Sequence, residues 1–68
     1  MITVYTREGC PRCKVLKAKL EIRGIPYEEF TDVDRMIDMG IKDLPMMSTD
    51  GGKTLMDFGK AIQYISER

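Results

Sequence analysis

The chain has 68 residues, enough for one modest hydrophobic core, and we expect a single monomeric domain spanning residues 1–68. It carries 11 basic and 11 acidic side chains, so its formal net charge is zero, and a main function in nucleic-acid binding is not indicated. No apolar run is long enough to span a membrane or resembles a secretory signal, so we expect a cytoplasmic protein with no membrane partner.

The first part of the chain predicts a strand, a helix and a second strand. Residues 2–6 are mostly β-branched or aromatic and predict a strand, as do residues 27–31. Residues 11–23 predict a helix that has Cys10 as its N-cap, Pro11 in its first turn and Gly24 after its end. A right-handed crossover would make the two strands parallel. We expect the core side of this helix to be Val15, Leu16, Ala18, Leu20 and Ile22.

A short second helix is predicted next, ending at Gly40. Thr31 and Asp34 are spaced like a capping box at its start. Val33, Met36 and Ile37 would line its inner side. The following residues, 45–48, predict a third strand.

The last part of the chain predicts a hairpin and a helix. Residues 49–52 end in two glycines, which permit positive φ and favour a turn, so residues 53–56 would return as an antiparallel fourth strand. Asp57 is a good N-cap for the final helix. Its core side would be Phe58, Ala61, Ile62 and Ile65.

Cys10 and Cys13, the two cysteines of the chain, lie at the predicted start of the first helix. The N–H groups of a first helical turn lack internal partners and the helix dipole is positive there, which favours the thiolate of Cys10. The thiolate is the form that attacks disulfides. Cys13 lies one turn further on, close enough to form a disulfide with Cys10, so the pair indicates redox chemistry.

Three other roles for the cysteine pair remain open. A structural disulfide would close a very short loop, which gives little stabilisation. A zinc site usually needs four nitrogen or sulfur ligands, and one chain without histidine or further cysteine cannot complete it. Two inert cysteines would leave Pro11 at the helix start unexplained. In a reducing cytosol such pairs are usually catalytic.

On these residues the sequence resembles the glutaredoxin family, the small branch of the thioredoxin superfamily. The resemblance covers essentially the whole chain and rests on four segments in the family's order: Val4-Tyr5-Thr6-Arg7 leading into Cys10-Pro11-Arg12-Cys13-Lys14, Gly24-Ile25-Pro26-Tyr27, Ile41-Lys42-Asp43-Leu44-Pro45 and Asp50-Gly51-Gly52-Lys53. It implies an α/β, thioredoxin-like (glutaredoxin) fold with a four-stranded mixed sheet and helices on both faces.

The resemblance also implies roles for single residues. Cys10 would be the attacking nucleophile and Cys13 the resolving thiol, with Pro11 and Arg12 between them contributing to substrate binding. Leu44 would pair its backbone with an extended thiol substrate beside Pro45, across an expected cis Leu44–Pro45 bond. Arg7 stands where the family has a basic residue that can meet a carboxylate of glutathione.

The stretch before the last helix departs from the family pattern. Glutathione-binding glutaredoxins usually have a Gly-Gly pair and then a small residue, where this chain has Leu55-Met56-Asp57-Phe58. Asp57 could bind the ammonium of glutathione or simply cap the helix, and both readings stay open. The aromatic Phe58 resembles redoxins that supply ribonucleotide reductase and are recharged by thioredoxin reductase. Glutathione, as a co-substrate, and a thioredoxin-reductase-type flavoenzyme are therefore both candidate electron donors.

Three functions are compatible with these residues. The first is a dithiol–disulfide oxidoreductase that reduces a disulfide-containing protein through Cys10 and Cys13, without a bound cofactor or metal. The second is an iron–sulfur or metal carrier bridged by glutathione, which would be coloured on anaerobic purification. The third is a redox-inactive binding module that uses the edge at Leu44 and Pro45. The presence of both cysteines favours the first.

Overall fold

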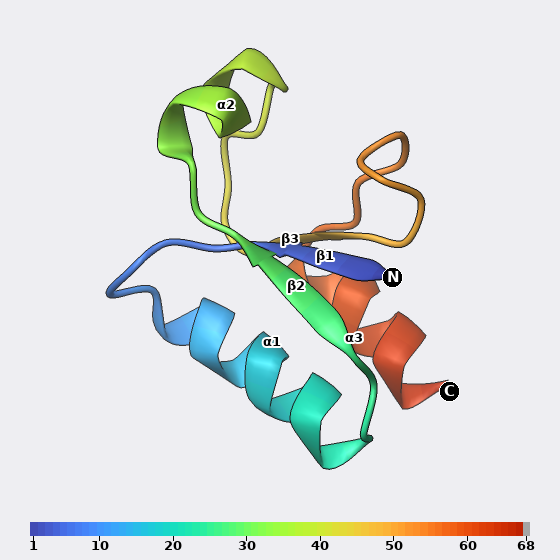
Figure 1. Ribbon diagram of the computed structural model, residues 1–68. Coiled ribbons are helices and arrows are strands. Elements are labelled where there is room, and N and C mark those ends of the chain that lie inside the picture. The colour runs from blue at the N-terminus through green and yellow to red at the C-terminus, as the bar shows by residue number, and fades with distance from the viewer. Residues whose placement is uncertain (68) are drawn as a thin grey trace.

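The computed structural model describes residues 1–67, in which strands and helices alternate. The elements are β1 (Ile2–Tyr5), α1 (Pro11–Ile22), β2 (Tyr27–Phe30), α2 (Val33–Asp38), β3 (Met46–Ser48) and α3 (Phe58–Ser66). The sheet has the order β2-β1-β3, with β2 parallel and β3 antiparallel to β1. Helices α1 and α3 lie on one side of the sheet and α2 on the other (Figure 1). This three-stranded mixed sheet between helices fits a thioredoxin-like fold.

The main core lies between the sheet and the pair α1 and α3. From the helices it takes Leu16, Leu20, Ala61 and Ile65, and from the strands Ile2, Val4 and Met47. A smaller cluster under α2 consists of Tyr5, Met36 and Ile41. Because successive strand residues point to opposite faces, Val4 belongs to one cluster and Tyr5 to the other.

The prediction for the core side of α1 was only partly right. Leu16 and Leu20 are fully buried, but Val15 is 45% exposed, Ile22 is 81% exposed and Ala18 is exposed as well. An α-helix turns by about 100° per residue, so positions 16 and 20 point toward the core while 15, 18 and 22 point away from it. The apolar residues of α1 therefore occupy two opposite faces.

Two expectations for α2 were wrong. The N-cap is Asp32 rather than Thr31, because the Asp32 carboxylate accepts a hydrogen bond from the Arg35 N–H at 3.2 Å. Only Met36 of the helix is buried, whereas Val33 and Ile37 are exposed. A helix of six residues is less than two turns long, so it presents little more than one position to the core.

The predicted fourth strand is not formed, and a single bridge between Met47 and Met56 takes its place. In the turn before Met56, backbone N–H groups donate hydrogen bonds to side-chain oxygens. The Ser48 hydroxyl accepts from the Gly52 N–H at 2.9 Å, and the Asp50 carboxylate accepts from the Thr54 N–H at 2.9 Å. These bonds compete with the regular backbone hydrogen bonds between two strands, so pairing with β3 occurs only at Met56.

Hydrogen bonds from the Thr54 backbone and from the Ser48 hydroxyl lower the pKa of the Asp50 carboxyl to about 2. The ionised carboxylate thus remains the acceptor that holds this turn.

No helix within residues 1–67 is both long enough and apolar enough to cross a membrane.

Candidate active site

Cys10 is the N-cap of α1, as the sequence predicted. Its backbone is extended, with φ −95° and ψ 109°, and Pro11 opens the helix. The Cys13 backbone N–H donates to the Cys10 Sγ at 3.3 Å. Gly9, immediately before it, has a φ of +81°, a left-handed conformation that favours glycine and turns the chain into the helix. The two cysteines are thus brought together at the first turn of α1.

The surroundings of the two thiols shift their pKa values in opposite directions. Burial would raise the pKa of Cys10, but hydrogen bonds from the Cys13 side chain and from the Cys13 and Arg12 backbones, with the Arg12 charge, lower it. Burial raises the pKa of Cys13, and its hydrogen bond to the Cys10 side chain adds to this effect. Cys10 is therefore the thiol that ionises first.

The exposure of the two thiols to solvent also favours Cys10 as the reactive one. Both cysteines are free, Cys10 being half-buried and Cys13 only 1% exposed. A molecule in solution therefore meets the Cys10 sulfur first.

We expect limiting iodoacetamide to label Cys10 in strong preference to Cys13, because Cys10 is both the more acidic and the more accessible thiol. The labelling rate should rise with pH through a midpoint below that of an unperturbed thiol. Peptide mapping of the reduced protein measures the preference, and the denatured protein, in which both thiols are exposed, serves as the control. Equal labelling of the two cysteines in the folded protein would contradict this assignment.

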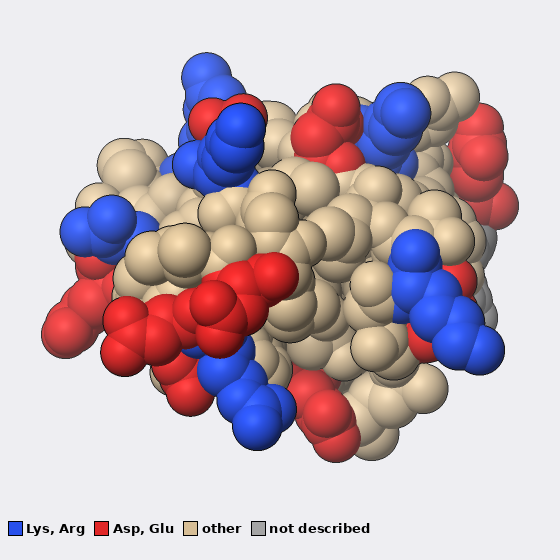
Figure 2. All heavy atoms as spheres, turned by 90° about the horizontal axis from the view of Figure 1, so that it is seen from above, with Lys and Arg blue, Asp and Glu red and all other residues tan. Residues whose placement is uncertain are grey.

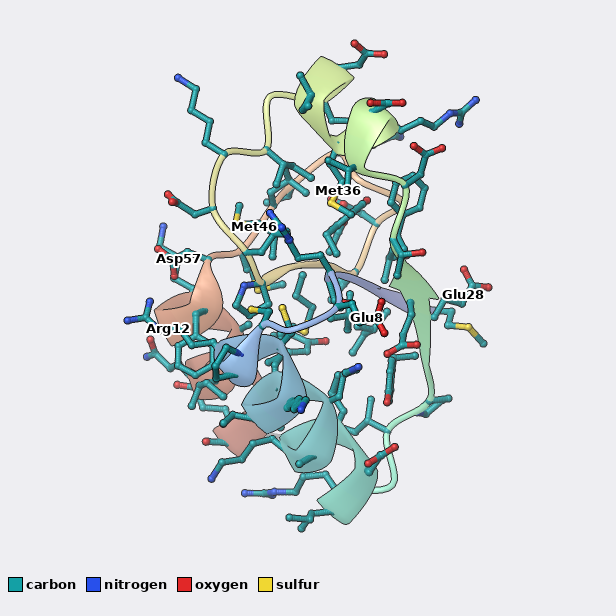
Figure 3. The ribbon with its side chains drawn as sticks, turned by 90° about the vertical axis from the view of Figure 1, so that its left-hand side faces the viewer. Glu8, Arg12, Glu28, Met36, Met46 and Asp57 are labelled. Atoms are coloured by element: carbon teal, nitrogen blue, oxygen red, sulfur yellow. The ribbon has the colours of Figure 1, made fainter. Side chains whose placement is uncertain are left out.

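A groove beside the cysteines gathers most of the residues predicted to bind substrate. Its lining comprises Arg12, Asp43, Leu44, Pro45, Asp57, Phe58 and Gly59. The Leu44–Pro45 bond is cis, which confirms the expectation, and Pro45 is fully buried. Arg12 and Asp57 lie on the same side of the molecule near the start of α3 (Figure 3). Three segments distant in sequence, namely the start of α1, the loop before β3 and the start of α3, thus form one groove.

One side of this groove is structured by Phe58 and Asp57. The Arg12 guanidinium lies over the Phe58 ring, 5.8 Å from its centroid, at a distance suited to a cation–π interaction. Phe58 also packs against the main core. One carboxylate oxygen of Asp57 accepts from the Lys60 N–H at 2.8 Å, which makes Asp57 the N-cap of α3 as predicted. Its role toward a ligand remains a prediction.

Arg7 does not line this groove. It lies in the loop before α1 and borders a separate hollow together with Thr6, Glu8, Lys17, Glu29, Thr31 and Val33. The structure therefore separates Arg7 from the predicted residues that line the groove, and Pro11, exposed at the start of α1, is not part of that lining either. Its role toward glutathione remains a prediction.

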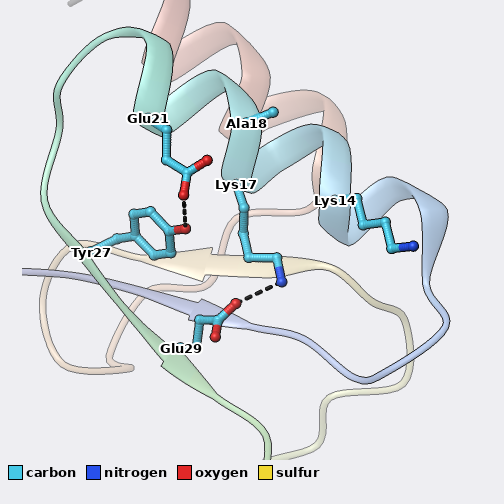
Figure 4. A pocket seen from close by; sticks show the side chains of 6 residues that line it. All are labelled: Lys14, Lys17, Ala18, Glu21, Tyr27 and Glu29. Carbon is cyan, nitrogen blue, oxygen red and sulfur yellow. Dashed lines mark hydrogen bonds and ion pairs between the residues drawn. The ribbon is translucent and has the colours of Figure 1, made fainter.

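Sequence reasoning missed an ion pair close to the cysteines. The Lys17 Nζ lies 2.6 Å from a carboxylate oxygen of Glu29 and joins α1 to β2 (Figure 4). Lys17 stands one helical turn after Cys13, and its positive charge lowers the pKa of that thiol against the larger effect of burial. The spacing of four residues between Cys13 and Lys17 was visible in the sequence. The pairing of Lys17 with Glu29 was not, because it depends on how α1 packs against β2.

Comparison with known proteins now identifies the family. The family model described as glutaredoxin matches residues 2–43, which include β1, both cysteines and β2. The chain belongs to the glutaredoxin family. The match ends just before Leu44, so the groove residues on the loop before β3 and on α3 lie largely outside it.

Two relatives of this glutaredoxin-family protein carry the same description, glutaredoxin-like protein NrdH. They come from Lactococcus lactis subsp. lactis and Lactococcus lactis subsp. cremoris. Each is 30% identical over 56 residues, which covers 74% of this chain and 78% of the relative. The similarity identifies a redoxin of the glutaredoxin family and supports a thiol–disulfide redox function in general.

Proposed function

We propose that this redoxin is a dithiol–disulfide oxidoreductase that reduces disulfides in other proteins, with Cys10 as the nucleophile and Cys13 as the resolving thiol. One observation carries the proposal. The Cys10 Sγ lies at the start of α1 and accepts the N–H of Cys13, and its pKa is lowered while that of the buried Cys13 is raised. This asymmetry supports a fixed order of attack.

In the first step the Cys10 thiolate attacks one sulfur of the substrate disulfide. A Cys10–substrate disulfide forms, the substrate S–S bond breaks, and the released substrate sulfur takes a proton from solvent. In the second step Cys13 gives up its proton and its thiolate attacks the Cys10 Sγ. The Cys10–substrate bond breaks and the second substrate sulfur leaves as a thiol. Two electrons have passed to the substrate, and a Cys10–Cys13 disulfide remains.

The groove beside Cys10 supports binding of an extended substrate chain. Leu44 borders it and is only partly buried, which supports pairing of its backbone with a substrate segment in the manner of an added strand. The groove also carries charges of both signs, from Arg12, Asp43 and Asp57. Such a lining suits the varied polar groups of a peptide.

We propose that the electron acceptor is a reductase such as ribonucleotide reductase and that a thioredoxin-reductase-type flavoenzyme recharges the disulfide form. The relatives are described as glutaredoxin-like, and the aromatic Phe58 resembles the redoxins that supply ribonucleotide reductase; both support the first part. For the second part, Phe58 under the Arg12 guanidinium fills volume in the groove that the γ-glutamyl end of glutathione would need. Individual charge contacts at an exposed groove contribute about 1 kcal/mol or less, so shape should dominate the choice of donor.

The donor can be identified with the oxidised protein and NADPH. We expect thioredoxin reductase to sustain reduction of insulin disulfides at least about tenfold faster than glutathione with glutathione reductase, because shape excludes glutathione. NADPH oxidation measures both rates, and the Cys10→Ser protein is the blank.

Two outcomes would contradict different parts of this proposal. Equal or faster turnover with glutathione would contradict the assigned donor. Failure of the chemically reduced protein to reduce insulin at all would contradict the dithiol mechanism itself.

A further inference from the structure

Helix α1 carries an apolar stripe on the side that faces away from the core. Pro11, Val15, Ala18 and Ile22 are all exposed, Ile22 to 81%. With about 100° between successive residues, these four positions fall within a narrow arc opposite Leu16 and Leu20. Single exposed apolar residues are ordinary, but four aligned along one helix face form a contiguous patch of the kind that marks an interaction site.

The stripe begins beside the reactive sulfur. Pro11 directly follows Cys10, and the stripe then runs the length of the 12-residue helix, which is about 18 Å. The helix lies at the edge of the molecule, with its core side toward the sheet and α3 (Figure 1). A protein that brings a disulfide to Cys10 is therefore placed to contact this face.

Basic residues border the stripe on both sides. On the helical projection Lys14 lies along one edge and Arg12, Lys19 and Arg23 along the other, all of them exposed. Lys17 does not add to this excess because it is paired with Glu29. Glu21, the one acidic residue of the helix, lies beside Lys14 on this projection and keeps its negative charge, although it accepts a hydrogen bond from the Tyr27 hydroxyl at 3.2 Å (Figure 4). The positive excess therefore lies mainly on the edge formed by Arg12, Lys19 and Arg23.

This concentration of positive charge is local. The formal net charge of the chain is zero, so the excess along α1 is balanced elsewhere. The opposite face of the molecule, seen from the α2 side, shows acidic and basic side chains interspersed (Figure 2). The outer face of α1 thus combines an apolar centre with a polar rim in which basic side chains outnumber the one acidic side chain, and an apolar centre within a polar rim is typical of a protein interface.

We propose that the outer face of α1 is the docking surface for the protein partner whose disulfide reacts with Cys10, and that the partner's matching surface is apolar with an acidic rim. Opposite charge on the rim would steer the encounter, and the apolar stripe would be buried in the complex. A second copy of this chain fits poorly, because two such faces would oppose their basic rims. The inference rests on the proposed function, since the partner is defined as the carrier of the disulfide.

The test uses the Cys13→Ser protein, which stops at the mixed disulfide, and two synthetic peptides. Both carry one cysteine as a pyridyl disulfide, followed by about eight residues, long enough in extended form to cover α1. Leucines alternate with glutamates in one peptide and with lysines in the other. Release of the pyridyl thiol measures the rate of attack by Cys10.

We expect the glutamate peptide to react at least about tenfold faster than the lysine peptide at low ionic strength, and the difference to shrink near 1 M salt, where charges are screened beyond about 3 Å. The double change Val15→Glu with Ile22→Glu should reduce the ratio of the two rates to less than about threefold. It places charges within the apolar stripe and lowers the positive charge of the rim. Both positions are exposed, so the fold should be kept, as circular dichroism can verify.

Two controls accompany the test. Val33→Glu with Ile37→Glu places the same two charges on α2, at positions that are 46% and 64% exposed on the other side of the sheet, and should keep the full preference. Neutral dipyridyl disulfide carries no charge and is too small to extend along the stripe, so its rate corrects for any change in the reactivity of Cys10 itself.

Equal rates for the two peptides would overturn the proposal, and so would a preference that survives in the double variant. Dimerisation of the unmodified protein that the double variant abolishes would assign the face to a second copy and overturn the assigned partner. Failure of Cys10 to react even with dipyridyl disulfide would instead overturn the proposed function.

Discussion

Cys10→Ser should lower protein-disulfide reduction by at least about a thousandfold, to the uncatalysed background, because the attacking sulfur is gone. Cys13→Ser should keep the first step and accumulate a mixed disulfide between Cys10 and the substrate. The lowered pKa of Cys10 and the near-complete burial of Cys13 are the reasons for this difference. Insulin reduction measures the activity, and intact-mass spectrometry detects the trapped adduct.

The two serine variants also serve as controls for each other, since each removes one sulfur from the same helical turn. The order of steps would be wrong if both retained comparable protein-disulfide reductase activity. It would also be wrong if the adduct formed on Cys13 in the Cys10→Ser protein.

Leu20→Ala should destabilise the fold by about 2–5 kcal/mol, since Leu20 is fully buried in the main core and its loss leaves a cavity. Domains of this kind have a total stability of about 5–15 kcal/mol, so the loss is a large fraction. Urea denaturation monitored by circular dichroism gives the free energy of unfolding directly.

Ile22→Ala is the matched control, because it removes the same number of carbon atoms from the same helix at a position that is 81% exposed. It should change the free energy of unfolding by no more than about 0.5 kcal/mol. Similar losses in the two variants would show that α1 packs in a different orientation from the one described.

The sequence predicted best those features that local residues decide. Cys10 and Asp57 cap their helices as expected, because a cap depends on a side chain and the N–H groups two or three positions away. Gly24 and Gly40 have positive φ values just after their helices, where glycine is favoured. These signals extend over a few residues and need no knowledge of the tertiary structure.

Features that depend on distant parts of the chain were predicted less well. All five apolar residues of α1 were taken as core, although only Leu16 and Leu20 face it, because composition alone does not say which side of a helix meets the sheet. The fourth strand was expected from the turn signal at Gly51 and Gly52. The side chains of Ser48 and Asp50 take up the N–H groups of that turn instead.

In the candidate site too, features set by neighbouring residues were predicted better than features that depend on distant parts of the chain. The cysteine pair was evident from its spacing at a helix start, and the groove at Leu44, Pro45 and Phe58 followed from the family resemblance. The Lys17–Glu29 ion pair was missed, since it depends on how α1 lies across β2. The separation of Arg7 from the groove likewise follows from the course of the loop before α1.

The mass of the protein after one turnover shows directly whether Cys10 and Cys13 exchange a disulfide with the substrate. The fully reduced protein is mixed with one equivalent of a protein disulfide, quenched with acid and analysed by intact-mass spectrometry and peptide mapping. We expect the protein to lose two hydrogens and to contain a disulfide that joins Cys10 to Cys13, and the substrate to gain two hydrogens. An unchanged protein mass, or a persistent adduct that Cys13 never resolves, would contradict this dithiol exchange.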